Sequence, residues 1–155
     1  MLDADLATRA QALATLLAAR LAGTAFDPVL VHGDFSADQV VMGDGGPVIL
    51  DWDNAGLGDP ARDLGSFLAR MDAQVIDGLL TQDQADDRSA ALLQGYGTVP
   101  TSMALHHARA LMLLLTEGFR NRNPDWPART QNLMDPLEHV LGIMTTHHAS
   151  GLCRS

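Results

Sequence analysis

The chain has 155 residues, of which 46% are hydrophobic and 19% are charged, and its formal net charge is −9. This length suits one domain with a hydrophobic core, and the composition excludes general disorder. The acidic balance argues against a protein that binds nucleic-acid phosphates, because that affinity comes mostly from Lys and Arg. It suits metal ions or cationic small molecules better.

All ten positively charged residues are arginines, because the sequence contains no lysine. Mechanisms that need a lysine of this chain, such as a Schiff base, are therefore excluded. Cys153 is the only cysteine, so the chain has neither an internal disulfide nor a cysteine zinc site. The N-terminus is acidic, unlike a signal peptide, and no apolar run is long enough to span a membrane. We therefore expect a cytoplasmic protein.

The first third of the chain combines one helix with short strands. Apolar residues recur every three or four positions over residues 4–22, which predicts an amphipathic helix. Short runs rich in β-branched residues predict strands at 29–31, 40–42 and 48–50. Glycines separate the last two strands and supply the positive φ angles of tight turns, so we expect a β-hairpin there.

Helices are predicted for the rest of the chain. After a glycine-containing loop at 54–58, Asp59 is expected to cap a helix that starts at Pro60 and ends near Met71. Further helices are predicted at roughly 72–80, 83–95, 102–120 and 129–147. The sequence therefore predicts a single domain over residues 1–155 of the mostly α (α+β) class, a helical bundle with a small β-hairpin.

Two acidic residues flank the predicted strands. Asp34 follows the first strand, and Asp51 ends the third. A catalytic loop followed by a hairpin that delivers a second aspartate is the layout of phosphoryl transfer, in which one carboxylate meets the attacking hydroxyl and another holds Mg²⁺. Gln39 stands where kinases have a metal-binding Asn. We expect the hairpin to bring Asp34, Gln39 and Asp51 together.

Over residues 30–70 the sequence resembles the aminoglycoside phosphotransferase and choline kinase-like superfamily, whose fold is protein-kinase-like. The resemblance is carried by His32-Gly33-Asp34, Leu50-Asp51-Trp52-Asp53 and Gly58-Asp59-Pro60-Ala61-Arg62-Asp63-Leu64. It implies transfer of the γ-phosphate of ATP to a hydroxyl of a small molecule, with Mg²⁺ as cofactor. The acidic chain would suit a cationic acceptor such as an aminoglycoside or an amino alcohol.

The resemblance also implies the roles of the principal site residues. Asp34 would be the catalytic base or would orient the hydroxyl, and Asp51 would be the main Mg²⁺ ligand. Gln39 would be the second protein ligand of the metal. The family usually has Asn at this position, and Gln offers the same amide oxygen on a longer arm, with altered geometry.

Three further residues have supporting roles by the same resemblance. His32 and Asp63 would brace the catalytic loop by hydrogen bonds. Asp53 would support either the metal shell or the substrate side.

The nucleotide-binding N-terminal lobe of kinase-like folds has no counterpart in this sequence. That lobe supplies a sheet, a loop over the phosphates and a lysine, whereas the helix at 4–22 resembles the helix that precedes the catalytic loop. The chain is therefore interpreted as a C-terminal lobe alone. We expect exposed apolar surface that would dock the missing lobe or drive self-association.

Three other features are interpreted as structural. Trp52 is expected to lie in the core. Because adjacent residues of a helix do not face one another, two histidine pairs are not expected to bind a metal: His106-His107 and His147-His148. One basic-aromatic group is interpreted as a solvated loop rather than an anion site: Arg120, Arg122 and Trp126.

Two alternatives to a phosphotransferase stay open. The first is a non-catalytic descendant that binds a ligand or partner, which the absence of lysine and the presence of Gln39 favour. The second is a metal-dependent phosphohydrolase that uses His32, Asp34, Asp51 and Asp53. It is the weaker, because hydrolase sites usually gather more His and carboxylate ligands than these two motifs provide.

Overall fold

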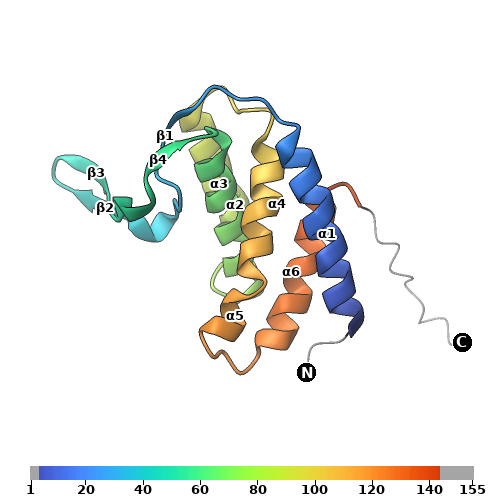
Figure 1. Ribbon diagram of the computed structural model, residues 1–155. Helices are drawn as coiled ribbons and strands as arrows, with labels where there is room; N and C mark the ends of the chain where they lie inside the picture. The colour runs from blue at the N-terminus through green and yellow to red at the C-terminus, as the bar shows by residue number, and fades with distance from the viewer. Residues whose placement is uncertain (1–3, 144–155) are drawn as a thin grey trace, which may run out of the picture.

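The computed structural model describes residues 4–143 as a bundle of helices with two small pairs of strands (Figure 1). The expected mostly helical α+β class is confirmed. The elements in chain order are α1 (Ala4–Ala22), β1 (Val29–Val31), β2 (Val40–Gly43), β3 (Gly46–Ile49), β4 (Gly56–Gly58), α2 (Ala61–Ile76), α3 (Gln82–Tyr96), α4 (Met103–Leu114), α5 (Glu117–Arg120) and α6 (Trp126–Val140).

The core lies between α1, α2, α4 and α6. Leu6, Leu13 and Leu17 form the buried stripe of α1, and this confirms the amphipathic helix predicted at residues 4–22. They pack with fully buried side chains of α4 and α6, among them Leu111 and Leu133. Burial of each such side chain stabilises the fold by about 1.5–3 kcal/mol.

Gly65 allows α2 and α4 to approach closely at the centre of this bundle. A Cβ at this position would overlap the backbone between His106 and His107 of α4. The crossing fixes the first turn of α2 against α4. The start of α2 carries residues of the candidate site, so this packing positions the site.

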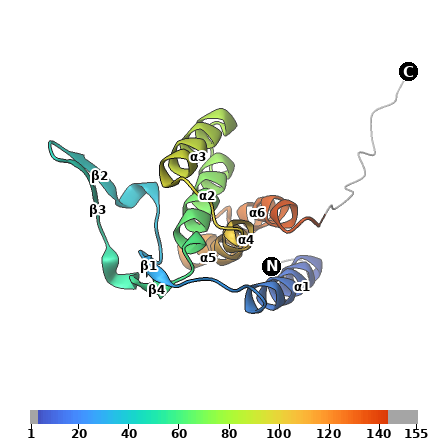
Figure 2. The ribbon, with the colours of Figure 1, turned by 90° about the horizontal axis from the view of Figure 1, so that it is seen from above.

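The two strand pairs lie beside the bundle. The predicted hairpin is confirmed as β2 and β3, with Val40 opposite Ile49, and it projects away from the helices (Figure 2). The second pair joins β1 to β4 antiparallel, with Val31 opposite Gly56. The loop predicted at 54–58 is therefore partly a strand. Its sequence Gly-Leu-Gly has little intrinsic strand preference, so the pairing depends on the distant β1.

Several predicted helix boundaries were wrong. The helices predicted at 60–71 and 72–80 are one helix, α2, which ends at Ile76. The helix predicted at 102–120 divides into α4 and α5 around Leu115, and α6 begins at Trp126 rather than at 129. Residues 115–116, between α4 and α5, include no Gly or Pro, so tertiary packing decides this break, whereas Gly78 follows the end of α2 and Pro127 stands in the first turn of α6. The end predicted at 147 lies outside the described residues, and α6 already stops at Val140.

The start of α2 was predicted one residue too early, with Asp59 as the cap. The structure has Pro60 at the cap position and Ala61 as the first helical residue. Even so, Asp59 Oδ1 accepts a hydrogen bond from the backbone N–H of Ala61 at 2.8 Å. The side chain thus satisfies one free donor of the helix terminus, as a capping residue does.

Candidate active site

Asp63 holds the loop that carries Asp34. Its carboxylate accepts hydrogen bonds from two successive backbone N–H groups, of His32 at 2.7 Å and of Gly33 at 2.8 Å. Asp63 lies in the first turn of α2, so the loop is fixed to the rigid bundle rather than to a mobile connection. Bonds to an ionised acceptor are about twice as strong as neutral ones. Asp34 follows immediately and is exposed.

His32 closes the other side of this loop. Its side chain is buried, and Nε2 donates a hydrogen bond to the carbonyl oxygen of Leu50 at 2.8 Å. The ring also packs against Trp52 and Phe35, with centroids 5.0 Å and 5.9 Å away. The hydrogen bonds expected of His32 and Asp63 are present, and their contribution to activity stays a prediction.

The loop and the segment that carries Asp51 lie against each other. Besides its bond to His32, Leu50 donates its N–H to the carbonyl oxygen of Gln39 at 2.9 Å. On the other side, Gly33 has φ +90°, and a Cβ there would overlap the carbonyl of Asn54. Glycine is thus required at Gly33 both by its backbone conformation and by this close approach.

Asp51 has an unusual backbone conformation. Its φ of 62° and ψ of 60° are left-handed, which is uncommon for a non-glycine residue, although Asp tolerates it better than most. Conformations of this kind cluster at functional sites. The side chains of Asp51 and Asp53 are both exposed. Trp52, expected in the core, is 48% exposed, so that prediction was wrong: this turn lies at the surface, and only one side of the indole packs on His32.

Gln39 is turned toward its own loop. Its Oε1 accepts a hydrogen bond from the backbone N–H of Ser36 at 3.0 Å, within a short turn over residues 37–39. An amide oxygen has two lone pairs, so this bond leaves one acceptor site. The structure places Gln39 next to the Asp51 segment but shows its amide engaged in a local cap.

A cavity of about 250 Å³ opens beside Asp34. Its wall includes Asp34 and Asn54 from the loops and three helices of the bundle, but neither Asp51 nor Gln39. The helices contribute Arg62, Ser66, Arg70, Arg109, Ala110, Leu113, Leu114, Glu117 and Arg120. Asp34 is thus the member of the predicted site that lines this cavity, and Asp51 and Gln39 do not line it.

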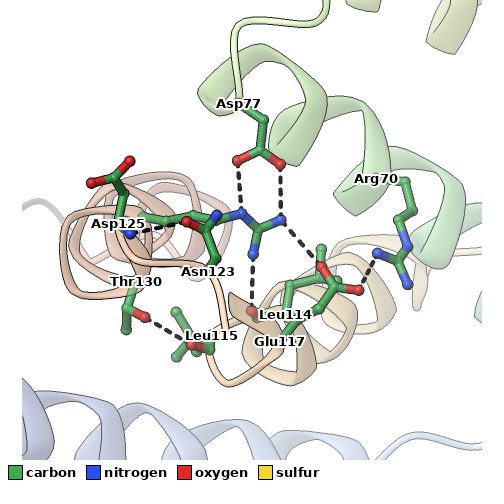
Figure 3. Close-up of polar contacts among 9 residues, drawn as sticks. Arg70, Asp77, Leu114, Leu115, Glu117, Asn123, Asp125 and Thr130 are labelled. Carbon is green, nitrogen blue, oxygen red and sulfur yellow. Dashed lines mark hydrogen bonds and ion pairs between the residues drawn. The ribbon is translucent and has the colours of Figure 1, made fainter. Parts of the chain in front are cut away.

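The polar groups of this cavity have unequal partners. Arg70 is paired with Glu117, and both of Glu117's oxygens are engaged because Arg129 also contacts it at 3.2 Å (Figure 3). Arg62 and Arg109 have no carboxylate partner among residues 4–143. Burial lowers the pKa of Arg109, and the nearby positive charge of Arg62 lowers it further.

Asp59 connects the start of α2 to the start of α4. Its Oδ1 also accepts a hydrogen bond from the buried hydroxyl of Ser102 at 3.0 Å, and its Oδ2 lies 3.1 Å from Nε2 of His106. Burial lowers the pKa of His106, and Asp59 opposes that effect. In the neighbouring position, Nε2 of His107 lies 2.7 Å from a carboxylate oxygen of Asp72. Both histidines thus contact carboxylates of α2 or its cap, whereas His147-His148 lies outside the described residues.

Within residues 4–143, no group of three or more His, Cys, Asp or Glu side chains could together hold a metal. A Mg²⁺ site does not require such a group, because this ion keeps several waters and takes one or two carboxylates together with substrate phosphates. Asp51 fits that requirement, since its carboxylate is exposed and held on a constrained turn. Gln39 fits it only through its second lone pair or after rotation.

Comparison with known protein families supports the resemblance that the motifs carry. The model of the phosphotransferase enzyme family matches residues 1–106. The chain belongs to this phosphotransferase family. The match includes His32-Gly33-Asp34, the Asp51 motif and the whole of α2. A comparison with curated proteins and a comparison with solved structures each found no match to this chain.

Sequence reasoning missed several residues of this cavity. Arg62 stands within the Gly58–Leu64 motif but was assigned no role, and no local pattern marks Arg109 as its neighbour. Arg120, interpreted as part of a solvated loop, lines the cavity, while Trp126 packs edge-on against Phe119, with centroids 5.3 Å apart.

Among the described residues, no helix is long and apolar enough to cross a membrane.

Proposed function

We propose that the protein is the kinase-like C-terminal lobe of an ATP-dependent phosphotransferase that acts on a hydroxyl of a small molecule. The observation that carries this proposal is Asp34, which stands on the wall of a cavity while Asp63 fixes its loop. Phosphoryl transfer needs positioning and charge neutralisation more than covalent chemistry. A rigidly held carboxylate beside a small-molecule cavity meets the first of these needs.

Asp34 accepts the proton of the acceptor hydroxyl, or orients that hydroxyl, during attack on the γ-phosphate. Asp51 would hold Mg²⁺, with Gln39 as a second protein ligand. When bound, the ion neutralises negative charge on the phosphates of ATP. His32 and Asp63 keep the Asp34 loop at a fixed distance from the Asp51 turn, because Leu50 and Gly33 join the two segments.

Exposed apolar side chains of the strand region support a docking surface for a further lobe. Leu30, Met42 and Leu57 are 68%, 74% and 79% exposed, and all three lie on the strand pairs. Large apolar patches of this kind mark interaction surfaces. We propose that a nucleotide-binding lobe, or a second copy of this chain, covers them. A cytoplasmic location, where ATP is supplied, agrees with this function.

Substitution of Asp34 tests the proposal. We expect the protein, joined to a nucleotide-binding lobe where its own chain does not bind ATP, to transfer phosphate from Mg²⁺-ATP to a hydroxyl acceptor. Asp34→Asn should lower kcat by about 10²–10⁴-fold, because it removes the proton acceptor. Asp38→Asn is the matched control, since Asp38 is exposed in the same loop. Equal turnover by Asp34→Asn and Asp38→Asn would show that Asp34 is not catalytic.

The metal assignment has a test of its own that needs no turnover. Mg²⁺ should raise the melting temperature of the chain, or of its complex with ATP, through the carboxylate of Asp51. Asp51→Asn keeps a residue that tolerates a positive φ and removes the charge, so the effect of Mg²⁺ should disappear. Asp44→Asn, in the exposed hairpin turn, should keep it. An unchanged Mg²⁺ effect in Asp51→Asn would exclude Asp51 as the main ligand.

A non-catalytic binding lobe is the second candidate. The observation in its favour is the hydrogen bond between Gln39 and Ser36, which turns a predicted metal ligand toward its own loop. This candidate predicts that the chain binds a small ligand in the cavity beside Asp34 but transfers no phosphate, even when it is joined to a nucleotide-binding lobe. If the substitution Gln39→Asn alone restored phosphate transfer, the chain would be identified as a non-catalytic descendant of an active phosphotransferase.

A further inference from the structure

The cavity beside Asp34 is positively charged, although the chain as a whole is strongly acidic. Four of the ten arginines line it, against two carboxylates, which leaves a local net charge of two positive. The four are Arg62, Arg70, Arg109 and Arg120. Charges of one sign gathered along the wall of a cleft raise the local concentration of ligands of the opposite sign. The local charge therefore favours an anionic ligand, opposite to the ligand that the net charge of −9 favours.

The carboxylates of the cavity do not neutralise this charge. Glu117 is shared between Arg70 on α2 and Arg129 on α6, and Figure 3 shows its carboxylate directed at Arg70. Arg129 is also held by both carboxylate oxygens of Asp77. This network engages both carboxylate oxygens of Glu117. Asp34, the other carboxylate of the wall, forms no ion pair with Arg62 or Arg109 in the described structure.

Arg62 and Arg109 form no ion pair with a carboxylate among residues 4–143, although both also border a neighbouring hollow that Asp59 lines. The Nε atom of Arg62 is buried and has no hydrogen-bond partner in the described structure. A buried donor that lacks a partner destabilises the structure, and more so when it is charged. Burial, and to a smaller extent the positive charge of Arg62, lower the pKa of Arg109. A bound anion would satisfy both side chains, since guanidinium groups bind carboxylate and phosphate in bidentate fashion.

Arg62 is also tied to the catalytic loop. Its neighbour Asp63 accepts the hydrogen bonds of His32 and Gly33, so Arg62 and Asp34 are held by the same first turn of α2. Arg109 comes from α4, which is locked against α2 at Gly65. A ligand anchored by the two arginines would therefore lie at a fixed position relative to Asp34. Ser66 and Asn54, also on the wall, supply hydrogen bonds for further hydroxyl groups.

We propose that this cavity binds a small hydroxylated molecule that carries an anionic group, either carboxylate or phosphate, with Arg62 and Arg109 as its anchor and Asp34 at its hydroxyl. The class is thus a small anionic alcohol, such as a hydroxy acid or a polyol phosphate, and not the cationic acceptor that the net charge favours. As an acceptor assignment it rests on the proposed phosphotransferase function, whereas the anion site itself is independent of turnover.

Titration calorimetry on the whole chain tests the anion site. The anionic probes are glycerate and glycerol 3-phosphate, which separate a carboxylate from a phosphate, and the comparison probes are uncharged glycerol and cationic ethanolamine. We expect at least one anionic probe to bind at least tenfold more tightly than glycerol or ethanolamine. Arg62→Gln and Arg109→Gln should each weaken that binding by about tenfold or more.

Arg88→Gln is the matched control. Arg88 is exposed on α3 and is not part of the cavity, so this variant removes the same charge without touching the site. Circular dichroism of each variant shows whether it folds, and Arg62→Lys, which keeps the charge but loses the bidentate geometry, gives a second measurement should Arg62→Gln unfold. Equal binding of charged and uncharged probes, or equal weakening by Arg88→Gln, would overturn the proposal.

The two hypotheses fail differently. If anionic probes bind through Arg62 and Arg109 but no hydroxyl compound is phosphorylated, the phosphotransferase function fails and the anion site stands. If phosphate is transferred to uncharged or cationic alcohols and Arg62→Gln leaves their kcat/KM unchanged, the function stands and the anionic class is wrong. If kcat/KM for an anionic alcohol falls at least tenfold in Arg62→Gln, both are supported.

Discussion

The carboxylate of Asp63 accepts the backbone N–H of Gly33 at 2.8 Å, and this bond joins the first turn of α2 to the residue that precedes Asp34. The partners are thirty residues apart in sequence. Because α2 is locked in the bundle, the bond transmits the rigidity of the core to a surface loop. A catalytic group on such a loop keeps its position without being buried itself.

Removal of this acceptor should destabilise the loop and the fold. Asp63→Asn keeps the shape of the side chain but places an NH₂ group against a backbone donor. We expect the free energy of unfolding to fall by about 1–3 kcal/mol, measured by urea denaturation. Asp87→Asn, at an exposed position of α3, should leave it within about 0.5 kcal/mol. Equal stabilities of the two variants would mean that Asp63 does not brace the loop.

Gly65 and Gly95 offer a contrast between two helical glycines. Gly65→Ala should destabilise the protein by about 1–3 kcal/mol, since its Cβ would collide with the α4 backbone. Gly95→Ala, on α3, meets nothing within 4 Å and should stabilise the protein by up to about 1 kcal/mol, because Ala is the better helix former. Thermal unfolding followed by circular dichroism measures both. The two substitutions must change the stability in opposite directions. A Gly65→Ala variant more stable than the parent would contradict the close packing of α2 on α4.

The buried imidazole of His106 should make stability depend on pH. Burial lowers its pKa in the folded state below the ordinary value of 6.5, so the unfolded chain binds the proton more tightly. Stability contributed by the neutral ring is therefore present above pH 6.5 and is lost as the pH falls from there toward the lower folded-state pKa. His106→Gln should flatten this dependence in urea denaturation between pH 7.5 and 5.5.

His139→Gln is the control for the pH experiment. His139 is exposed on α6, so its removal takes away an imidazole without altering the contact between α4 and Asp59. The free energy of unfolding is plotted against pH for each variant. The difference in slope between the His106→Gln and His139→Gln variants gives the contribution of His106. A His106→Gln variant that loses stability on acidification as steeply as the parent would assign the dependence to other groups.

The exposed apolar strands predict association. Light scattering over a range of concentrations should show a mass that rises with concentration, unless a nucleotide-binding lobe covers the strands. Replacement of Met42 and Leu57 by Ser should shift the chain toward the monomer. Leu79→Ser is the control, because Leu79 is equally apolar and 71% exposed but lies in the turn after α2. A parent chain that stays monomeric at high concentration would contradict the docking surface.

Local sequence patterns predicted the elements whose signals are themselves local. The helix at 4–22 follows from the spacing of its leucines, and the β2–β3 hairpin from the glycines between two apolar runs. The strand β4 and the break between α4 and α5 could not be predicted in this way. Pairing of Gly56–Gly58 with β1 depends on a segment far away in sequence, and the break depends on how α4 and α5 pack against α6.

By itself, the sequence determined the family of this protein and the residues that carry its motifs, because those residues are contiguous: His32-Gly33-Asp34, Asp51-Trp52-Asp53 and the segment that ends in Asp63. Only the tertiary structure decided the character of the cavity. Its arginines come from α2, α4 and α5, and each is unremarkable in its own segment. Electrostatic potential depends on distances in space rather than along the chain. A chain with net charge −9 can therefore line a cavity beside Asp34 with a local excess of positive charge.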